Sequence, residues 1–193
     1  MEIREIHPRV DSAVRKLNRS GVTPDAINEA LAAALVDLFE VNGQAVSRDS
    51  PYSHYSEAMR LGFYTEKDPL LRGDRREYVV LALLASQQAE GNLGLHVFIA
   101  LMNGISPADV VNIMFLTGVY GGVNVLTNAL RIVAKTFDAV IAAADAPPTA
   151  TGDRSSITGE VIQKVLSAFP DPKYDEAKKH LEGDRGGDGG KGW

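Results

Sequence analysis

The chain contains no cysteine in its 193 residues. Disulfide bonds and thiol chemistry are therefore excluded within it, and the usual soft ligand for a metal ion is missing. An excess of positive charge is also lacking, since the formal net charge is -5 at pH 7. Nucleic acids and anionic membranes attract clustered basic residues, so we expect neither as a partner.

Long apolar runs are absent as well. No stretch reaches the roughly 18 apolar residues that a membrane-spanning helix needs. The charged N-terminal residues lack the apolar core of a secretory signal, and we therefore expect a cytoplasmic protein. With 45% hydrophobic and 23% charged residues, the composition is that of a soluble domain able to bury a core.

Helical periodicity runs through most of the chain and predicts an all-α fold. Val10, Ala13, Val14 and Leu17 follow the i, i+3, i+4, i+7 spacing of one buried stripe. Start and stop signals divide the helices from one another. Thr23-Pro24-Asp25 and Ser106-Pro107-Ala108-Asp109 each place a capping hydroxyl before a proline and an acid. Asp74 is expected to cap a third helix, and the pairs Asn103-Gly104 and Gly121-Gly122 to end two others.

Residues 78–85 are apolar at every position, which predicts burial on all sides. Periodicity alone does not separate a buried helix from a buried strand here, but length and the Leu/Ala content favour a helix. A polar turn over 86–91 and a second apolar helix over 93–102 follow. Together these two helices carry more apolar surface than one small domain covers, so we expect a homo-oligomer.

Composition divides the chain into three regions. Residues 1–148 form a predicted helical domain, residues 149–182 a linker and C-terminal helices or arm, and residues 183–193 a Gly-rich disordered tail. The arm carries a clean apolar stripe between Ile157 and Phe169. One hypothesis is that this stripe grips a neighbouring subunit.

Four features over roughly residues 55–137 resemble the carboxymuconolactone decarboxylase family, which shares the AhpD-like fold. They are an Arg-rich helix start (Arg75, Arg76), a histidine eight residues before a glycine (His96, Gly104), the Gly-Ile-Ser-Pro-Ala-Asp helix start, and Val119-Tyr120-Gly121-Gly122 before a helix that contains Arg131-Ile132-Val133-Ala134. The resemblance implies an AhpD-like helical bundle that assembles as a homo-oligomer, a trimer or a hexamer.

The peroxidase branch of the family resembles Cys-x-x-Cys-x-x-x-His, with a glutamate twelve residues before the first cysteine. Projected back from His96, the two cysteine positions hold Ala89 and Asn92, and the glutamate position holds Glu77. Attack on a peroxide needs a thiolate, so thiol peroxidase activity is not expected. The thiol-free decarboxylase branch fits Leu93-Gly94-Leu95-His96-Val97, while Asn124 replaces a proline of its Tyr-x-Gly-x-Pro corner.

The resemblance implies a decarboxylase that acts on a small lactone or organic acid without a metal or cofactor. His96 is the candidate general acid/base, because imidazole exchanges protons near neutral pH. Glu77 is the candidate that orients it. Arg72, Arg75 and Arg76 are candidates for binding a substrate carboxylate, and Tyr120 for donating a hydrogen bond.

Each candidate also has a structural interpretation. His96 fits a satisfied core histidine, Glu77 and the arginines fit a surface ion-pair network, and Tyr120 fits a packed corner residue. No His, Asp or Glu lies three or four residues from His96, so no metal site is expected. The alternative function is a non-catalytic oligomeric or ligand-binding member of the same family.

Overall fold

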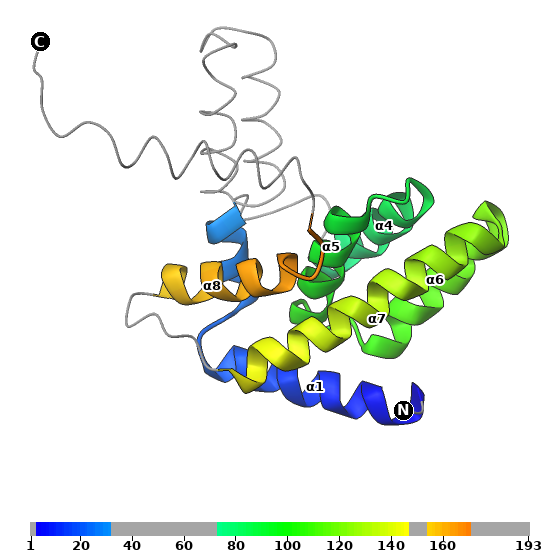
Figure 1. Ribbon diagram of the computed structural model, residues 1–193. Helices are drawn as coiled ribbons and strands as arrows, with labels where there is room; N and C mark the ends of the chain where they lie inside the picture. The colour runs from blue at the N-terminus through cyan, green and yellow to red at the C-terminus, as the bar shows by residue number, and fades with distance from the viewer. Residues whose placement is uncertain (1–2, 32–72, 147–153, 171–193) are drawn as a thin grey trace, which may run out of the picture.

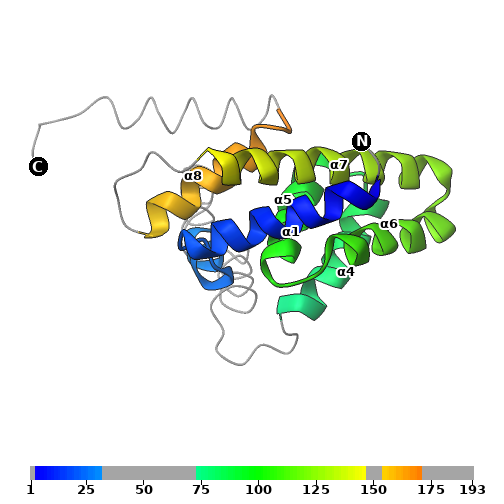
Figure 2. The same ribbon diagram turned by 90° about the horizontal axis from the view of Figure 1, so that it is seen from below.

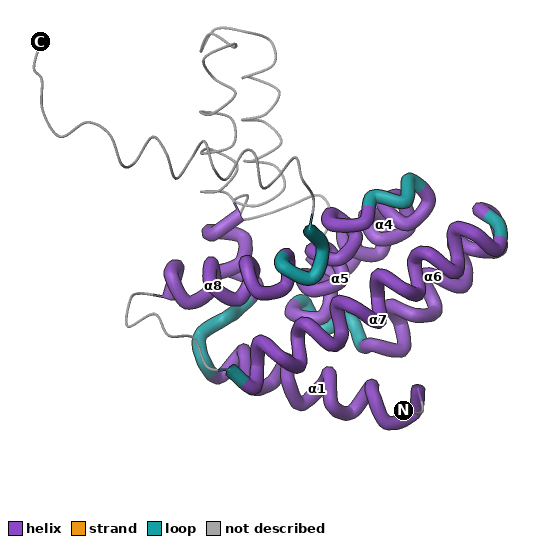
Figure 3. The backbone as a smooth tube through the Cα atoms, in the orientation of Figure 1, coloured by secondary structure: helices purple, strands orange, loops and turns teal. Residues whose placement is uncertain are grey.

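The computed structural model describes residues 3–31, 73–146 and 154–170, and every regular element in these ranges is a helix (Figure 3). The all-α prediction is therefore confirmed for the described residues. In chain order the helices are α1 (Ile3–Arg19), a helical run over 24–31, α4 (Gly73–Ser86), α5 (Glu90–Met102), α6 (Pro107–Gly121), α7 (Val123–Asp145) and α8 (Arg154–Leu166).

Helix α5 is the centre of the bundle and packs against α1, α4, α6, α7 and α8. Its residues from Val97 to Met102 are all buried. The long helix α7 runs beside α6 on one flank, and α1 crosses the bundle next to α7 (Figures 1 and 2). Because the second half of α5 is buried by these helices, its side chains are held in place by their packing.

The predicted helix boundaries are found at the expected signals. Ser106 caps α6 by accepting a hydrogen bond from the Asp109 backbone N–H at 3.1 Å, and Thr23 accepts one from the Ala26 N–H at 3.2 Å. Gly104 and Gly122 have positive φ angles of 87° and 90°, which glycine adopts readily at a helix end. Asp74 lies inside the first turn of α4, where its charge complements the helix dipole, and is not the cap.

The prediction that residues 78–85 are buried on all sides is wrong for the isolated chain. The segment is helical, as expected, but Tyr78, Val79 and Leu83 are exposed. The buried side of α4 consists instead of Arg76, Glu77, Leu81 and Ala85. The interior of the bundle therefore accepts a charged pair from α4, while apolar side chains of the same helix face outward.

The apolar stripe of the C-terminal region packs on its own chain. Helix α8 lies against α5 and α7, and Val161, Val165 and Phe169 are buried there. The structure thus gives no support to an arm that reaches a neighbour. The predicted domain limits fall at 148/149 and 182/183, outside the described residues.

Close approach between α8 and α5 depends on a glycine. A Cβ atom at Gly94 would lie 2.3–2.8 Å from three ring atoms of Phe169, which is closer than real contacts allow. The ring therefore fills the space that a side chain at position 94 would occupy. Phe169 lies three residues beyond the end of α8, so this contact fixes the chain that follows α8 on the central helix.

Gly94→Ala is expected to lower the free energy of unfolding by about 1–3 kcal/mol, because the added methyl group overpacks the contact with Phe169. Gly159→Ala is the matched control, since a Cβ there meets nothing within 4 Å and alanine favours a helix over glycine. Denaturant unfolding measures both. Equal stability of the two variants would contradict the contact, whereas relief of the Gly94→Ala defect by Phe169→Ala would support it.

Candidate active site

The α4–α5 hairpin brings Glu77 and His96 together. Its turn is a Schellman motif: the Ala89 N–H donates to the Leu84 carbonyl and the Gln88 N–H to the Ala85 carbonyl, both at 3.1 Å. Gln88 takes the left-handed conformation, with φ 55°, that such a motif requires. The turn reverses the chain within three residues, so α5 returns antiparallel along α4.

The other end of the hairpin fixes the axial register of the two helices. A Cβ at Gly73 would lie 2.6 Å from the Asn103 side-chain oxygen, so the start of α4 touches the end of α5. Glu77 lies four residues beyond this contact and His96 seven residues before it. At 1.5 Å per residue the two positions are offset by roughly 4.5 Å along the hairpin. Two long side chains span this offset.

The Glu77 carboxyl is completely buried and binds two neighbours. Its Oε2 lies 2.8 Å from His96 Nδ1, and its Oε1 accepts a hydrogen bond of 3.1 Å from Arg76 Nε. The Arg76 side chain is also buried, whereas the His96 side chain is 17% exposed. The three residues form a polar cluster, Arg76–Glu77–His96, inside an otherwise apolar layer.

This cluster defines what the imidazole can do. An ionised carboxylate only accepts hydrogen bonds, so the Nδ1 of His96 carries the hydrogen that points at Glu77. The Nε2 of neutral His96 is then left with its lone pair. No hydrogen bond from Nε2 to another described residue occurs. Arg76 balances the charge of Glu77, so the cluster remains neutral when His96 is neutral and gains one positive charge when His96 is protonated.

The remaining predicted site residues are not gathered at the cluster. Arg75 lies on the exposed side of α4, and Arg72 lies outside the described residues. Tyr120, at the end of α6, is 87% exposed and is therefore neither a packed corner residue nor a donor inside this chain's interior. The surface interpretation of Glu77 and Arg76 is wrong, because both are buried.

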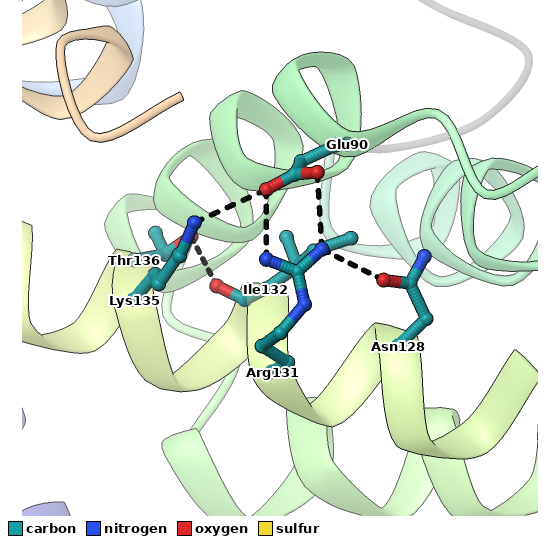
Figure 4. A network of polar contacts seen from close by, with 6 residues as sticks. All are labelled: Glu90, Asn128, Arg131, Ile132, Lys135 and Thr136. Atoms are coloured by element: carbon teal, nitrogen blue, oxygen red, sulfur yellow. Dashed lines mark hydrogen bonds and ion pairs between the residues drawn. The ribbon is translucent and has the colours of Figure 1, made fainter. Parts of the chain in front are cut away.

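A second polar network was not anticipated from the sequence. Arg131 on α7 donates two hydrogen bonds of 3.0 Å to the two carboxylate oxygens of Glu90, and Lys135 adds a third at 3.3 Å (Figure 4). The hydrogen bond from Arg131 is the main cause that lowers the pKa of Glu90 below 4.5. Glu90 is the first residue of α5, where an acid also favours the helix dipole. The network ties α5 to α7 on the surface.

The hairpin, its charged cluster and the following helices lie in one continuous stretch of sequence. Residues 54–135 match the carboxymuconolactone decarboxylase family. The resemblance read from the sequence is thereby confirmed, and the family segment contains the whole of α4, α5 and α6, with most of α7. No curated protein and no solved structure gives a significant match to the chain.

Two further findings concern the described part of the chain only. None of its helices combines the length and apolarity needed to cross a membrane. Within residues 3–31, 73–146 and 154–170, no three His, Cys, Asp or Glu side chains form a group that could hold a metal ion. The carboxymuconolactone decarboxylase segment therefore offers the Arg76–Glu77–His96 cluster as its candidate site.

Glu90→Gln is expected to lower the thermal unfolding midpoint at pH 7 by up to about 4 °C, because it removes an ion pair that is largely exposed to solvent. The folded-state pKa of Glu90 is depressed, so its stabilisation is present above 4.5 and is lost as pH falls through the lowered value. Wild type and variant should therefore converge in acid. Asp138→Asn, an exposed charge change on α7, the helix of Arg131 and Lys135, is the control. A Glu90→Gln deficit that persisted unchanged in acid would contradict the assignment.

Proposed function

We propose that this chain is a cofactor-independent, carboxymuconolactone-decarboxylase-like lyase with an AhpD-like bundle. It acts on a small organic acid or lactone, and His96 is the general acid/base. The observation that supports this proposal most strongly is the 2.8 Å contact between His96 Nδ1 and the buried Glu77 carboxyl. In general acid/base catalysis a carboxylate commonly orients one nitrogen of the imidazole while the other nitrogen can reach a substrate. The partly exposed ring of His96 fits this arrangement.

The proposed reaction is the loss of carbon dioxide from a substrate carboxylate. The carbon–carbon bond to the carboxylate breaks, and its electron pair moves into a conjugated carbonyl of the substrate to give an enolate. Protonated His96 then donates the Nε2 hydrogen to carbon and becomes neutral, and it recovers a proton from water. Glu77 stabilises the imidazolium that begins this step and fixes the ring orientation, so its role is positioning.

Arg76 has two roles in this proposal, and Arg72 and Arg75 share one of them. Arg76 neutralises Glu77 inside the cluster, which allows a carboxylate to remain buried beside an imidazole. Arg72 and Arg75 are proposed to bind the substrate carboxylate, together with the guanidinium of Arg76. Tyr120 is proposed as a hydrogen-bond donor to the substrate, which requires a neighbouring subunit because its side chain projects from this one.

We also propose that the chain forms a homo-oligomer, a trimer or a hexamer, and that it is cytoplasmic. The alternative function is a non-catalytic oligomeric or ligand-binding member of the family. The exposed apolar surface of α4 and α6 favours that alternative, because assembly alone explains it. Thiol peroxidase activity is not proposed, since Ala89 and Asn92 occupy the positions where the chemistry needs sulfur.

His96→Ala is expected to lower kcat/KM by about 10²–10⁴-fold on any small lactone acid or conjugated keto acid that wild type decarboxylates. Glu77→Gln should lower kcat by a smaller factor and alter the pH profile, because it removes the charge that stabilises imidazolium. His180→Ala is the histidine control and should match wild type. Release of carbon dioxide from a panel of such acids measures turnover.

The panel also separates the two functions. Turnover by wild type that is unaffected by His96→Ala would overturn the catalytic assignment. Binding of the acids, measured by calorimetry, with no turnover by any variant would favour the non-catalytic alternative.

A further inference from the structure

Large exposed apolar side chains are concentrated on two neighbouring helices. Among the described residues, those that stand out lie on α4, on α6 and at the first position of α7, and α4 packs against α6. We define the α4/α6 face as these eight residues: Tyr78, Val79, Leu83, Phe115, Leu116, Val119, Tyr120 and Val123. Their exposure ranges from 41% to 87%, and it is their concentration on two packed helices that is informative.

The face is large enough to form a stable interface. For side chains of these sizes, the exposed fractions amount to roughly 900 Å² of surface, against about 800 Å² per partner in a standard protein interface. The largest apolar patch of a typical monomer is only about 300–600 Å². Two aromatic rings with hydroxyl groups, Tyr78 and Tyr120, add the residue type that interfaces favour.

Charge is missing from the part of the chain that builds most of this face. No Asp, Glu, Lys or Arg occurs between Asp109 and Arg131, although charged residues make up 23% of the whole chain. The uncharged stretch covers nearly all of α6 and the first turns of α7. In a two-fold contact the same patch meets itself, so a charged side chain near the symmetry axis lies close to its own copy. A face without charges avoids that repulsion and therefore favours self-association.

The net charge of the chain also favours a second copy of the chain as the partner at this face. Two copies that each carry -5 repel one another, and this repulsion is least costly when they meet through surfaces without acidic residues. A membrane surface is a poorer fit. Helices that lie on membranes carry several Lys or Arg residues beside their apolar side. Helix α6 contains neither, and of the two arginines of α4 only Arg75 is exposed.

We propose that a second copy of this chain docks on the α4/α6 face. The proposal rests on the oligomeric state proposed above and does not depend on the chemistry of His96. It also links assembly to the candidate site, because Glu77 faces inward and Tyr78 and Val79 outward from the same turn of α4. Covering that turn holds α4 against α5, and the partner's copy of Tyr120 is carried into the interface.

Sedimentation of wild type and of the double variant Leu116→Glu/Val119→Glu tests this face. Wild type is expected to sediment as a dimer or larger species at about 10 μM. The double variant places acidic side chains opposite one another and should raise the dissociation constant at least about hundredfold, giving a monomer. Ala142→Glu, an exposed position on α7 away from the face, is the charge-matched control and should assemble like wild type.

Circular dichroism shows whether each variant is folded. If the double variant does not fold, Tyr120→Glu serves in its place, because that side chain is the most exposed of the face, and it should raise the dissociation constant at least about tenfold. A wild-type monomer at about 100 μM, with or without binding to vesicles, overturns the proposal. A wild-type oligomer that persists despite the acidic substitutions overturns the assignment of this face and leaves the proposed oligomeric state unchanged. A monomer would also overturn the proposed role of Tyr120, whereas the comparison with His96→Ala tests turnover separately.

Discussion

The burial of the Glu77 carboxylate is the constraint on which the rest of the structure depends. Removing such a group from water costs several kcal/mol unless partners replace the lost hydration. Arg76 and His96 are those partners, one from the same helix and one from the next. Packing of α4 on α5 therefore has to place His96 within hydrogen-bonding distance of Glu77, and the contacts at both ends of the hairpin achieve this register.

The same constraint explains why α4 has two different sides. Its inward side carries the charged pair, and this leaves Tyr78, Val79 and Leu83 to face outward. A surface helix usually turns its apolar side inward and its charged side outward. Around Glu77, α4 shows the reverse arrangement. The reversal fits a helix that lies between a reactive interior and a second subunit, which is how the proposed site and the proposed interface become neighbours.

Much of the fold was predictable because it rests on local signals. The caps at Thr23 and Ser106, the glycine at 104 and the stripe in α1 each specify a helix boundary or face by themselves. The orientation of α4 was not predictable, because its run of apolar residues hides the fact that Glu77 at its edge is buried. The turn at Gln88 lacks the glycine that usually marks a Schellman motif, so its close return was also not evident.

The candidate site was predictable in its residues but not in its geometry. A helical projection places Glu77 and His96 on facing helices with an offset of several ångströms, and only the tertiary contact between Gly73 and Asn103 determines whether they meet. Arg76 was expected at a substrate, but its hydrogen bond to Glu77 depends on how its side chain folds back along α4. The ion pair of Glu90 with Arg131 joins residues distant in sequence, which no spacing rule finds.

Nitrogen-15 NMR of histidine-labelled protein tests the central claim most directly, because it reports which ring nitrogen carries hydrogen. The His96 signals are assigned by their disappearance in His96→Asn. Contact with the buried carboxylate predicts that the neutral form of His96 carries its hydrogen on Nδ1 and leaves Nε2 bare. A neutral ring with its hydrogen on Nε2, or one that exchanges rapidly between both forms like a solvent-exposed histidine, would contradict the contact between His96 and Glu77.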